Sequence, residues 1–134
     1  MWYALMTLVI LCLAMALRIL FMPSRFQYKQ ISFENFLFLG ITYAIIMVGF
    51  GLVYVLLELK GLQVITDGGE PAGESFFERL GVSVYLSGIT LFSVGFGDVV
   101  PVGIGRAVVV AEALIGYTIP AAFVVRTFID FERK

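Results

Sequence analysis

The chain has 134 residues, of which 60% are hydrophobic and 14% are charged, and its formal charge is −1 with no histidine. Soluble domains carry about 25% charged residues, so this composition predicts an integral membrane protein of one domain. It excludes a disordered tail, offers no basic patch for nucleic acid, and with Cys12 as the only cysteine it disfavours disulfides, transition-metal sites and enzymatic chemistry.

The first apolar stretch covers residues 1–22, has Arg18 as its only charge, and ends before Pro23, which would break a helix. We expect an N-terminal hydrophobic helix that spans the membrane or is embedded in it. A signal peptide and an interfacial helix are the alternatives, although a signal peptide usually carries its positive charge before the apolar core. Residues 23–35 mix basic and aromatic side chains, which is typical of the lipid headgroup layer, and are predicted to form an interfacial linker.

The second apolar stretch has no charge in residues 35–57. At a rise of about 1.5 Å per residue it can cross about 30 Å of hydrocarbon, so we predict a spanning helix over residues 36–60. Within it, Gly49 and Gly51 would allow another helix to approach closely. Residues 61–75 are polar and rich in turn-forming residues, which predicts a loop outside the bilayer.

The next apolar segment, residues 80–97, carries no charge but is rich in serine, threonine and glycine. We predict a short helix over residues 76–92 and extended backbone over residues 93–98, because closely spaced glycines propagate helices poorly. Non-helical backbone at membrane depth persists only where protein buries it or water solvates it. The segment is therefore expected to form a re-entrant loop inside an oligomer.

Residues 90–98 read Thr-Leu-Phe-Ser-Val-Gly-Phe-Gly-Asp. This run resembles the T-x-T-T-V-G-Y-G-D signature of the potassium-channel pore-loop family. The resemblance implies an all-α membrane protein with a potassium-channel pore module: a transmembrane helix, a re-entrant pore helix with an extended selectivity filter, and a second transmembrane helix, preceded by one further hydrophobic helix. It also implies a homotetramer in the lipid bilayer, K⁺ as the permeating ion and no cofactor.

The residue types of the filter segment (residues 93–98) suit this chemistry. A dehydrated cation needs oxygens in place of its water shell, and consecutive carbonyls that point one way require positive φ at alternate residues, which glycine tolerates. We expect Gly95 and Gly97 to meet that need while Val94 and Phe96 pack outward against the short helix. The resemblance makes the K⁺-binding residues Ser93, Val94, Gly95, Phe96 and Gly97.

Asp98 follows the glycines, and in a tetramer it would form a ring of carboxylates that attracts cations at the outer mouth. A helix N-cap or an ion pair with Arg106 is the alternative.

The filter departs from the common family pattern at four positions: Ile89, Phe92, Ser93 and Phe96. These changes predict a filter held more by packing than by side-chain hydrogen bonds. They leave a non-selective cation channel, or a non-conducting membrane interaction subunit, as alternatives to a potassium-selective channel.

The last apolar stretch predicts an inner spanning helix over residues 101–130. Gly116 and Pro120 lie on one turn, and a proline ring clashes with the carbonyl four residues earlier, here that of Gly116. This pattern predicts a gating hinge, with ordinary helix packing as the alternative. Candidates for lining the pore, or alternatively for meeting lipid or another helix, recur at helical spacing: Tyr117, Ala121, Val124 and Phe128.

Glu112 is the one carboxylate within this helix, and a membrane-buried carboxylate marks a candidate site. Two placements agree equally well with the sequence. Glu112 either faces the ion cavity and attracts cations, or bonds to Ser87 or Thr90 behind the filter and supports it.

Basic residues favour the cytoplasmic side of a membrane protein. If residues 1–22 span, one side holds Arg18, Arg25, Lys29, Arg126, Arg133 and Lys134, and the other holds Lys60, Arg79 and Arg106. This predicts a multi-pass plasma-membrane protein with a cytoplasmic C-terminus.

Overall fold

The computed structural model describes residues 1–21 and 33–132, with side chains described for residues 1–18 and 36–125. Most of the predicted linker and the side chain of Phe128 therefore lie outside the described part. The elements are α1 (Trp2–Phe21), α2 (Phe33–Leu59), β1 (Ile65–Asp67), β2 (Glu70–Pro71), α3 (Phe76–Leu91), β3 (Val99–Pro101) and α4 (Gly105–Glu132). The predicted helical membrane architecture is confirmed, with a small sheet added to it.

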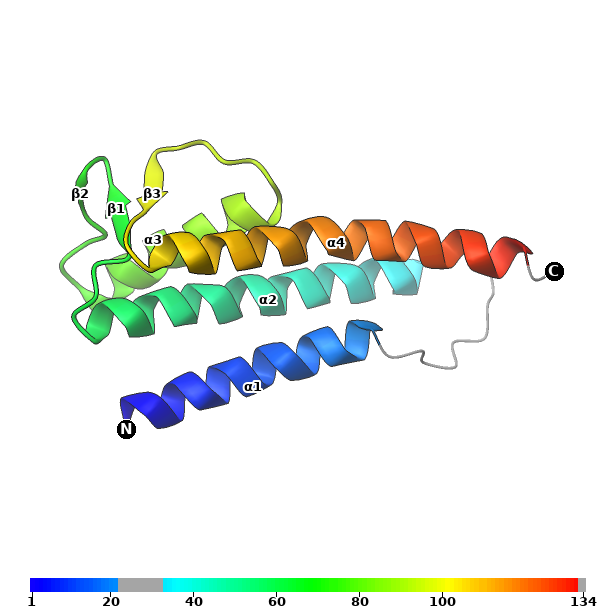
Figure 1. Ribbon diagram of the computed structural model, residues 1–134, viewed down its shortest axis with the longest axis horizontal. Coiled ribbons are helices and arrows are strands. Elements are labelled where there is room, and N and C mark those ends of the chain that lie inside the picture. The colour runs from blue at the N-terminus through cyan, green and yellow to red at the C-terminus, as the bar shows by residue number, and fades with distance from the viewer. Residues whose placement is uncertain (22–32, 133–134) are drawn as a thin grey trace.

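Two of the described helices are long and apolar enough to cross a membrane, over Phe36–Leu59 in α2 and Gly105–Val125 in α4. Figure 1 shows α1, α2 and α4 extended along the long axis of the molecule, with the strands gathered at the end where α1 begins. The ammonium group of Lys60, just after α2, lies 4.4 Å from the ring centroid of Tyr3 near the start of α1. The helices α1 and α2 are therefore antiparallel.

Close helix packing depends on the two glycines of α2 singled out by the sequence. A Cβ atom added at Gly49 would lie 2.6 Å from the Cδ2 atom of Leu13 on α1. A Cβ atom added at Gly51 would lie 2.7 Å from the Cγ2 atom of Val84 on α3 and 3.1 Å from its Cα atom. Since real Cβ atoms do not approach so closely, each glycine admits one neighbouring helix to the surface of α2.

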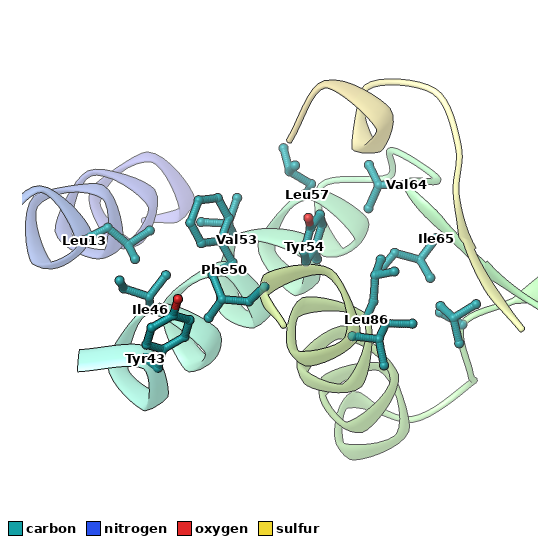
Figure 2. Packing of buried hydrophobic residues seen from close by; sticks show 14 of the residues in the cluster. Leu13, Tyr43, Ile46, Phe50, Val53, Tyr54, Leu57, Val64, Ile65 and Leu86 are labelled. Atoms are coloured by element: carbon teal, nitrogen blue, oxygen red, sulfur yellow. The ribbon is translucent and has the colours of Figure 1, made fainter. Parts of the chain in front are cut away.

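The buried apolar side chains join these helices to the strands. Figure 2 shows Leu13 of α1 near residues of α2, while Val64 and Ile65, which follow α2, share the cluster with Leu86 of α3. Tyr54 is fully buried within it. The short helix α3 is thereby held against α2 along the half of the molecule that carries the strands.

The sheet was not predicted. Its order is β2-β1-β3, and β1 pairs antiparallel with β3 so that Ile65 lies opposite Pro101 and Asp67 opposite Val99. The prediction that the inner helix begins at residue 101 is wrong, because Pro101 belongs to β3 and α4 begins at Gly105. Strands this short carry too few alternating residues to register as a pattern in the sequence.

Other predicted helix limits differ by one to three residues. The helix expected over residues 36–60 is α2, which spans Phe33–Leu59, and the helix expected over residues 76–92 is α3, which ends at Leu91. At the start of α3, the Ser75 side chain accepts a hydrogen bond from the Glu78 amide, and the Glu78 carboxylate accepts one from the Ser75 amide. The two bonds form a capping box. Because of the backbone donors of Ser75 and Glu74, the pKa of Glu78 is lowered.

The packing of α3 on α2 is tested by enlarging Gly51. Gly51→Ala places a methyl group on the backbone of Val84, so we expect it to lower the free energy of unfolding by about 1–3 kcal/mol. Gly40→Ala is the matched control on the same helix, because nothing lies within 4 Å of a Cβ atom added there. Thermal unfolding of both variants in detergent measures the difference, and equal midpoints would contradict this packing.

Candidate functional site

The backbone of the filter segment alternates in the way that inward-facing carbonyls require. Positive φ angles occur at Ser93 (57°), Gly95 (56°) and Gly97 (81°), every second residue. The expectation of positive φ at the two glycines is confirmed. Ser93 is the non-glycine residue with positive φ among those described, and such a conformation costs about 1–2 kcal/mol. A strained residue held at this place is typical of a functional site.

The amide groups at the inner end of this segment are tied to the end of α3. The Ser93 amide donates to the Thr90 carbonyl at 3.0 Å, and the amides of Val94 and Gly95 donate to the Ile89 carbonyl at 2.8 and 3.1 Å. Among the described residues, no backbone hydrogen bond has a carbonyl of residues 93–97 as its acceptor. Three amides of the segment are thus bound to α3, while its carbonyl oxygens receive no backbone donor among the described residues.

The apolar side chains of the segment are not covered within one chain. The expectation that Val94 and Phe96 pack against α3 is wrong for the single protomer, because they are 50% and 72% exposed. In one copy the segment is tied to the end of α3, and extended backbone projects alternate side chains away from the helix that anchors it. Large exposed apolar groups of this kind mark a candidate interaction surface.

Asp98 is held by the short helix. The hydroxyl of Tyr85 on α3 donates to Oδ2 of Asp98 at 2.7 Å, and this hydrogen bond is the main reason that the pKa of Asp98 is lowered. The helix N-cap alternative for Asp98 is wrong, since α4 begins only at Gly105. The Nε atom of Arg106 donates instead to the Pro101 carbonyl at 3.4 Å.

The Tyr85 contact adds a side-chain hydrogen bond to the filter segment, while the expectation that packing contributes more than such bonds stays a prediction. At its outer end the segment is fixed by a side-chain hydrogen bond from α3. The sequence offered a helix N-cap or Arg106 as the alternatives for Asp98 and did not point to Tyr85. A phenol on a short polar helix was the available signal, because buried or half-buried tyrosine hydroxyls usually have a partner.

Glu112 lies behind α3 and is fully buried. The Ser87 hydroxyl donates to its Oε1 atom, and the Tyr54 hydroxyl from α2 donates to its Oε2 atom at 2.7 Å. The sequence left two placements open for Glu112, facing the ion cavity or bonded to Ser87 or Thr90. The structure has the second, with Ser87 and not Thr90 as the partner. The carboxylate therefore joins α2, α3 and α4 within one chain. Tyr54 was missed because nothing in an apolar helix indicates which polar group its hydroxyl meets.

The turn of α4 at Gly116 lies against the end of α3. A Cβ atom added at Gly116 would overlap the Leu91 carbonyl and lie 3.0 Å from the Leu91 Cα atom, so only glycine fits there. On the same turn the Thr118 hydroxyl donates back to the Leu114 carbonyl at 2.8 Å, a contact that often bends helices. With Pro120 inside the helix, this turn is locally weakened, and Thr118 is the contributor that sequence reasoning missed.

The pore-lining candidates with described side chains, Tyr117, Ala121 and Val124, are all exposed in the single chain. Side chains that face a pore and side chains that face lipid would both be exposed in a single chain. Pore lining therefore stays a prediction. The fourth candidate, Phe128, lies outside the described side chains.

Comparisons with known proteins agree with this geometry. Residues 42–133 match the family described as "Ion channel". Two curated relatives, both called Protein LctB, align over 105 residues, which is 78% of this chain and 78% of each relative. The protein of Geobacillus stearothermophilus is 42% identical and that of Bacillus caldotenax is 39% identical. No solved structure matches the chain. With a family match over most of its length and two relatives of this similarity, the chain belongs to the ion channel family with a two-helix pore of the potassium-channel type.

Proposed function

We propose that the chain is a potassium-selective channel that passes K⁺ passively through a homotetrameric pore. The observation that carries the proposal is the backbone of residues 93–97, with positive φ at alternate residues and carbonyl oxygens that receive no backbone donor among the described residues. Rings of such oxygens can replace the hydration shell of a K⁺ ion. One chain supplies one wall, so a closed ring needs further copies around a symmetry axis.

The uncovered side chains of the segment support assembly. Phe96 is 72% exposed and Val94 is 50% exposed in the single chain, and contact with a neighbouring copy would bury both. Burial of apolar area contributes about 25 cal/mol per Å², which favours a ring over separate protomers. In that ring Asp98, whose pKa is lowered by the hydrogen bond from Tyr85, would concentrate cations at the outer mouth.

The buried group of Glu112, Ser87 and Tyr54 is proposed to support the filter from behind. Its hydrogen bonds fix α3 to both long helices, and the amides of Val94 and Gly95 are in turn tied to the end of α3. A satisfied buried polar network of this kind specifies one arrangement of the elements it joins. The network is therefore positioned to set the distance of the filter from the pore axis.

Gating is proposed to occur on α4, with Gly116 and Pro120 as the hinge and with Tyr117, Ala121, Val124 and Phe128 as lining residues. The weakened turn described above supports the hinge.

The orientation proposed for the chain is that of a multi-pass plasma-membrane protein with a cytoplasmic C-terminus, as the distribution of basic residues predicts. The antiparallel arrangement of α1 and α2, fixed by Tyr3 and Lys60, agrees with it.

Ion selectivity is tested by reconstituting the purified chain in bilayers with K⁺ on one side and Na⁺ on the other. We expect a reversal potential near the K⁺ equilibrium potential, and Gly95→Ala should abolish conduction because alanine at positive φ costs about 1–2 kcal/mol in every copy. Gly69→Ala is the matched control, since Gly69 also has positive φ (93°) but lies between β1 and β2. A reversal potential near zero would instead indicate a non-selective cation channel, and no conductance a non-conducting subunit.

The support network is tested by removing one hydroxyl from α3. Ser87→Ala deprives the Glu112 carboxylate of a buried donor, so we expect the free energy of unfolding to fall by about 1–3 kcal/mol. Ser83→Ala is the control one turn earlier, because the Ser83 hydroxyl is buried without a hydrogen-bond partner among the described residues. Thermal unfolding in K⁺ solution measures both, and a loss at position 83 as large as that at 87 would refute the network.

The role of Asp98 predicts a pH dependence of conduction. Because the pKa of Asp98 is lowered, its carboxylate stays ionised when the outer pH falls to the usual pKa range of an aspartate. Conduction should therefore be maintained in that range and decline only at lower pH. Tyr85→Phe removes the main cause, and the midpoint of the decline should move to higher pH. Unitary K⁺ conductance against outer pH measures this, with Asp98→Asn as the variant that lacks the titration. An unchanged midpoint in Tyr85→Phe would rule out this role for Tyr85.

A further inference from the structure

The weakened turn of α4 lacks one helical hydrogen bond. Pro120 has no amide hydrogen, so the carbonyl of Gly116, four residues earlier, cannot receive the usual helical donor. Gly116 is also buried. A buried carbonyl without a donor costs free energy comparable to a lost hydrogen bond, so the sequence creates a vacancy at this point of the helix.

A side chain from another helix supplies the donor. Tyr43 on α2, which is 73 positions away, donates from its hydroxyl to the Gly116 carbonyl at 2.9 Å. Tyr43 is 8% exposed, so this bond is made away from solvent. Figure 2 shows Tyr43 on α2 within the buried cluster, beside Ile46 and Phe50.

The ring of the same tyrosine contacts the start of the filter. Tyr43 stacks on Phe92 with ring centroids 5.3 Å apart and an interplanar angle of 12°. Phe92 is the C-cap of α3 and immediately precedes Ser93, the strained first residue of the filter segment. One side chain therefore holds the hinge carbonyl with its hydroxyl and the filter entrance with its ring.

We propose that Tyr43 is a positioning residue that links the bend of α4 to the inner end of the filter. This inference rests on the proposed channel function and assigns a regulatory contact to it. When α4 bends at the Gly116 turn, the Gly116 carbonyl moves, and Tyr43 either follows it and unstacks from Phe92 or releases it. The open or closed state of the inner helix is thereby coupled to the packing of the filter entrance.

The test is a double-mutant cycle between Tyr43→Phe and Pro120→Ala. Tyr43→Phe keeps the stacked ring and removes only the donor, so the ratio of open to closed dwell times should change about fivefold, which corresponds to about 1 kcal/mol. Pro120→Ala supplies an amide to the Gly116 carbonyl, so the tyrosine hydroxyl becomes redundant. In that background we expect Tyr43→Phe to change the ratio less than about twofold.

A second readout reports on the hinge without ion flow. Hydrogen exchange of the α4 peptide around Gly116, measured in lipid nanodiscs, should rise about fivefold in Tyr43→Phe and stay near the parent value in the double variant. Tyr3→Phe is the matched control, because it removes a phenol hydroxyl from α1, where Tyr3 contacts Lys60 through its ring. Its dwell times and exchange should both remain unchanged.

The filter half of the link is tested with Phe92→Leu, which keeps apolar bulk but removes the stacked ring. The measured quantity is the K⁺ concentration that gives half of the maximal protection against heat. Pro120→Ala should change this concentration by about twofold or more when Phe92 is present. The change should be smaller when Phe92 is replaced by leucine. Equal effects of Tyr43→Phe with and without Pro120 would overturn the link and leave Tyr43 a packing residue. A parent protein without K⁺ selectivity would overturn the proposed function instead, because the exchange cycle does not depend on which ion passes.

Discussion

Unpaired backbone oxygens are the constraint around which this chain is organised. Extended backbone normally consumes its carbonyls in a sheet, but here residues 93–97 present theirs without a backbone donor among the described residues, while the amides of Ser93, Val94 and Gly95 are secured to the end of α3. In the proposed pore, a cation would bind these oxygens. On this proposal, the remaining elements hold the segment in place for an ion and for neighbouring copies of the chain.

Three side-chain contacts provide that restraint, each from a different direction. Tyr85 fixes the outer end through Asp98, the Glu112 network fixes α3 between the long helices, and Tyr43 fixes the inner end through Phe92. Each contact involves a tyrosine: the hydroxyls of Tyr85 and Tyr54 bond to Asp98 and Glu112, and the ring of Tyr43 stacks on Phe92. Tyrosine suits this task because its ring packs in an apolar interior while its hydroxyl satisfies one polar group.

The sequence was sufficient where a residue type has a single physical use. The apolar stretches gave the long helices, and the alternating glycines gave positive φ at Gly95 and Gly97. It was insufficient for partners. Nothing local indicates that Tyr54 meets Glu112 or that Pro101 pairs with Ile65, because such contacts are set by how the helices pack. Some helix ends were misplaced, and the strands were not predicted because strands of two or three residues carry too little alternating pattern.

The most direct test of this account is the structure of the assembled protein crystallised with thallium, which stands in for K⁺ and is located by its anomalous scattering. The account predicts four copies around one axis, with a row of thallium ions on that axis in contact with carbonyl oxygens of residues 93–97. An assembly in which those carbonyls bond to protein donors, or in which the axis holds no ion at that depth, would contradict it.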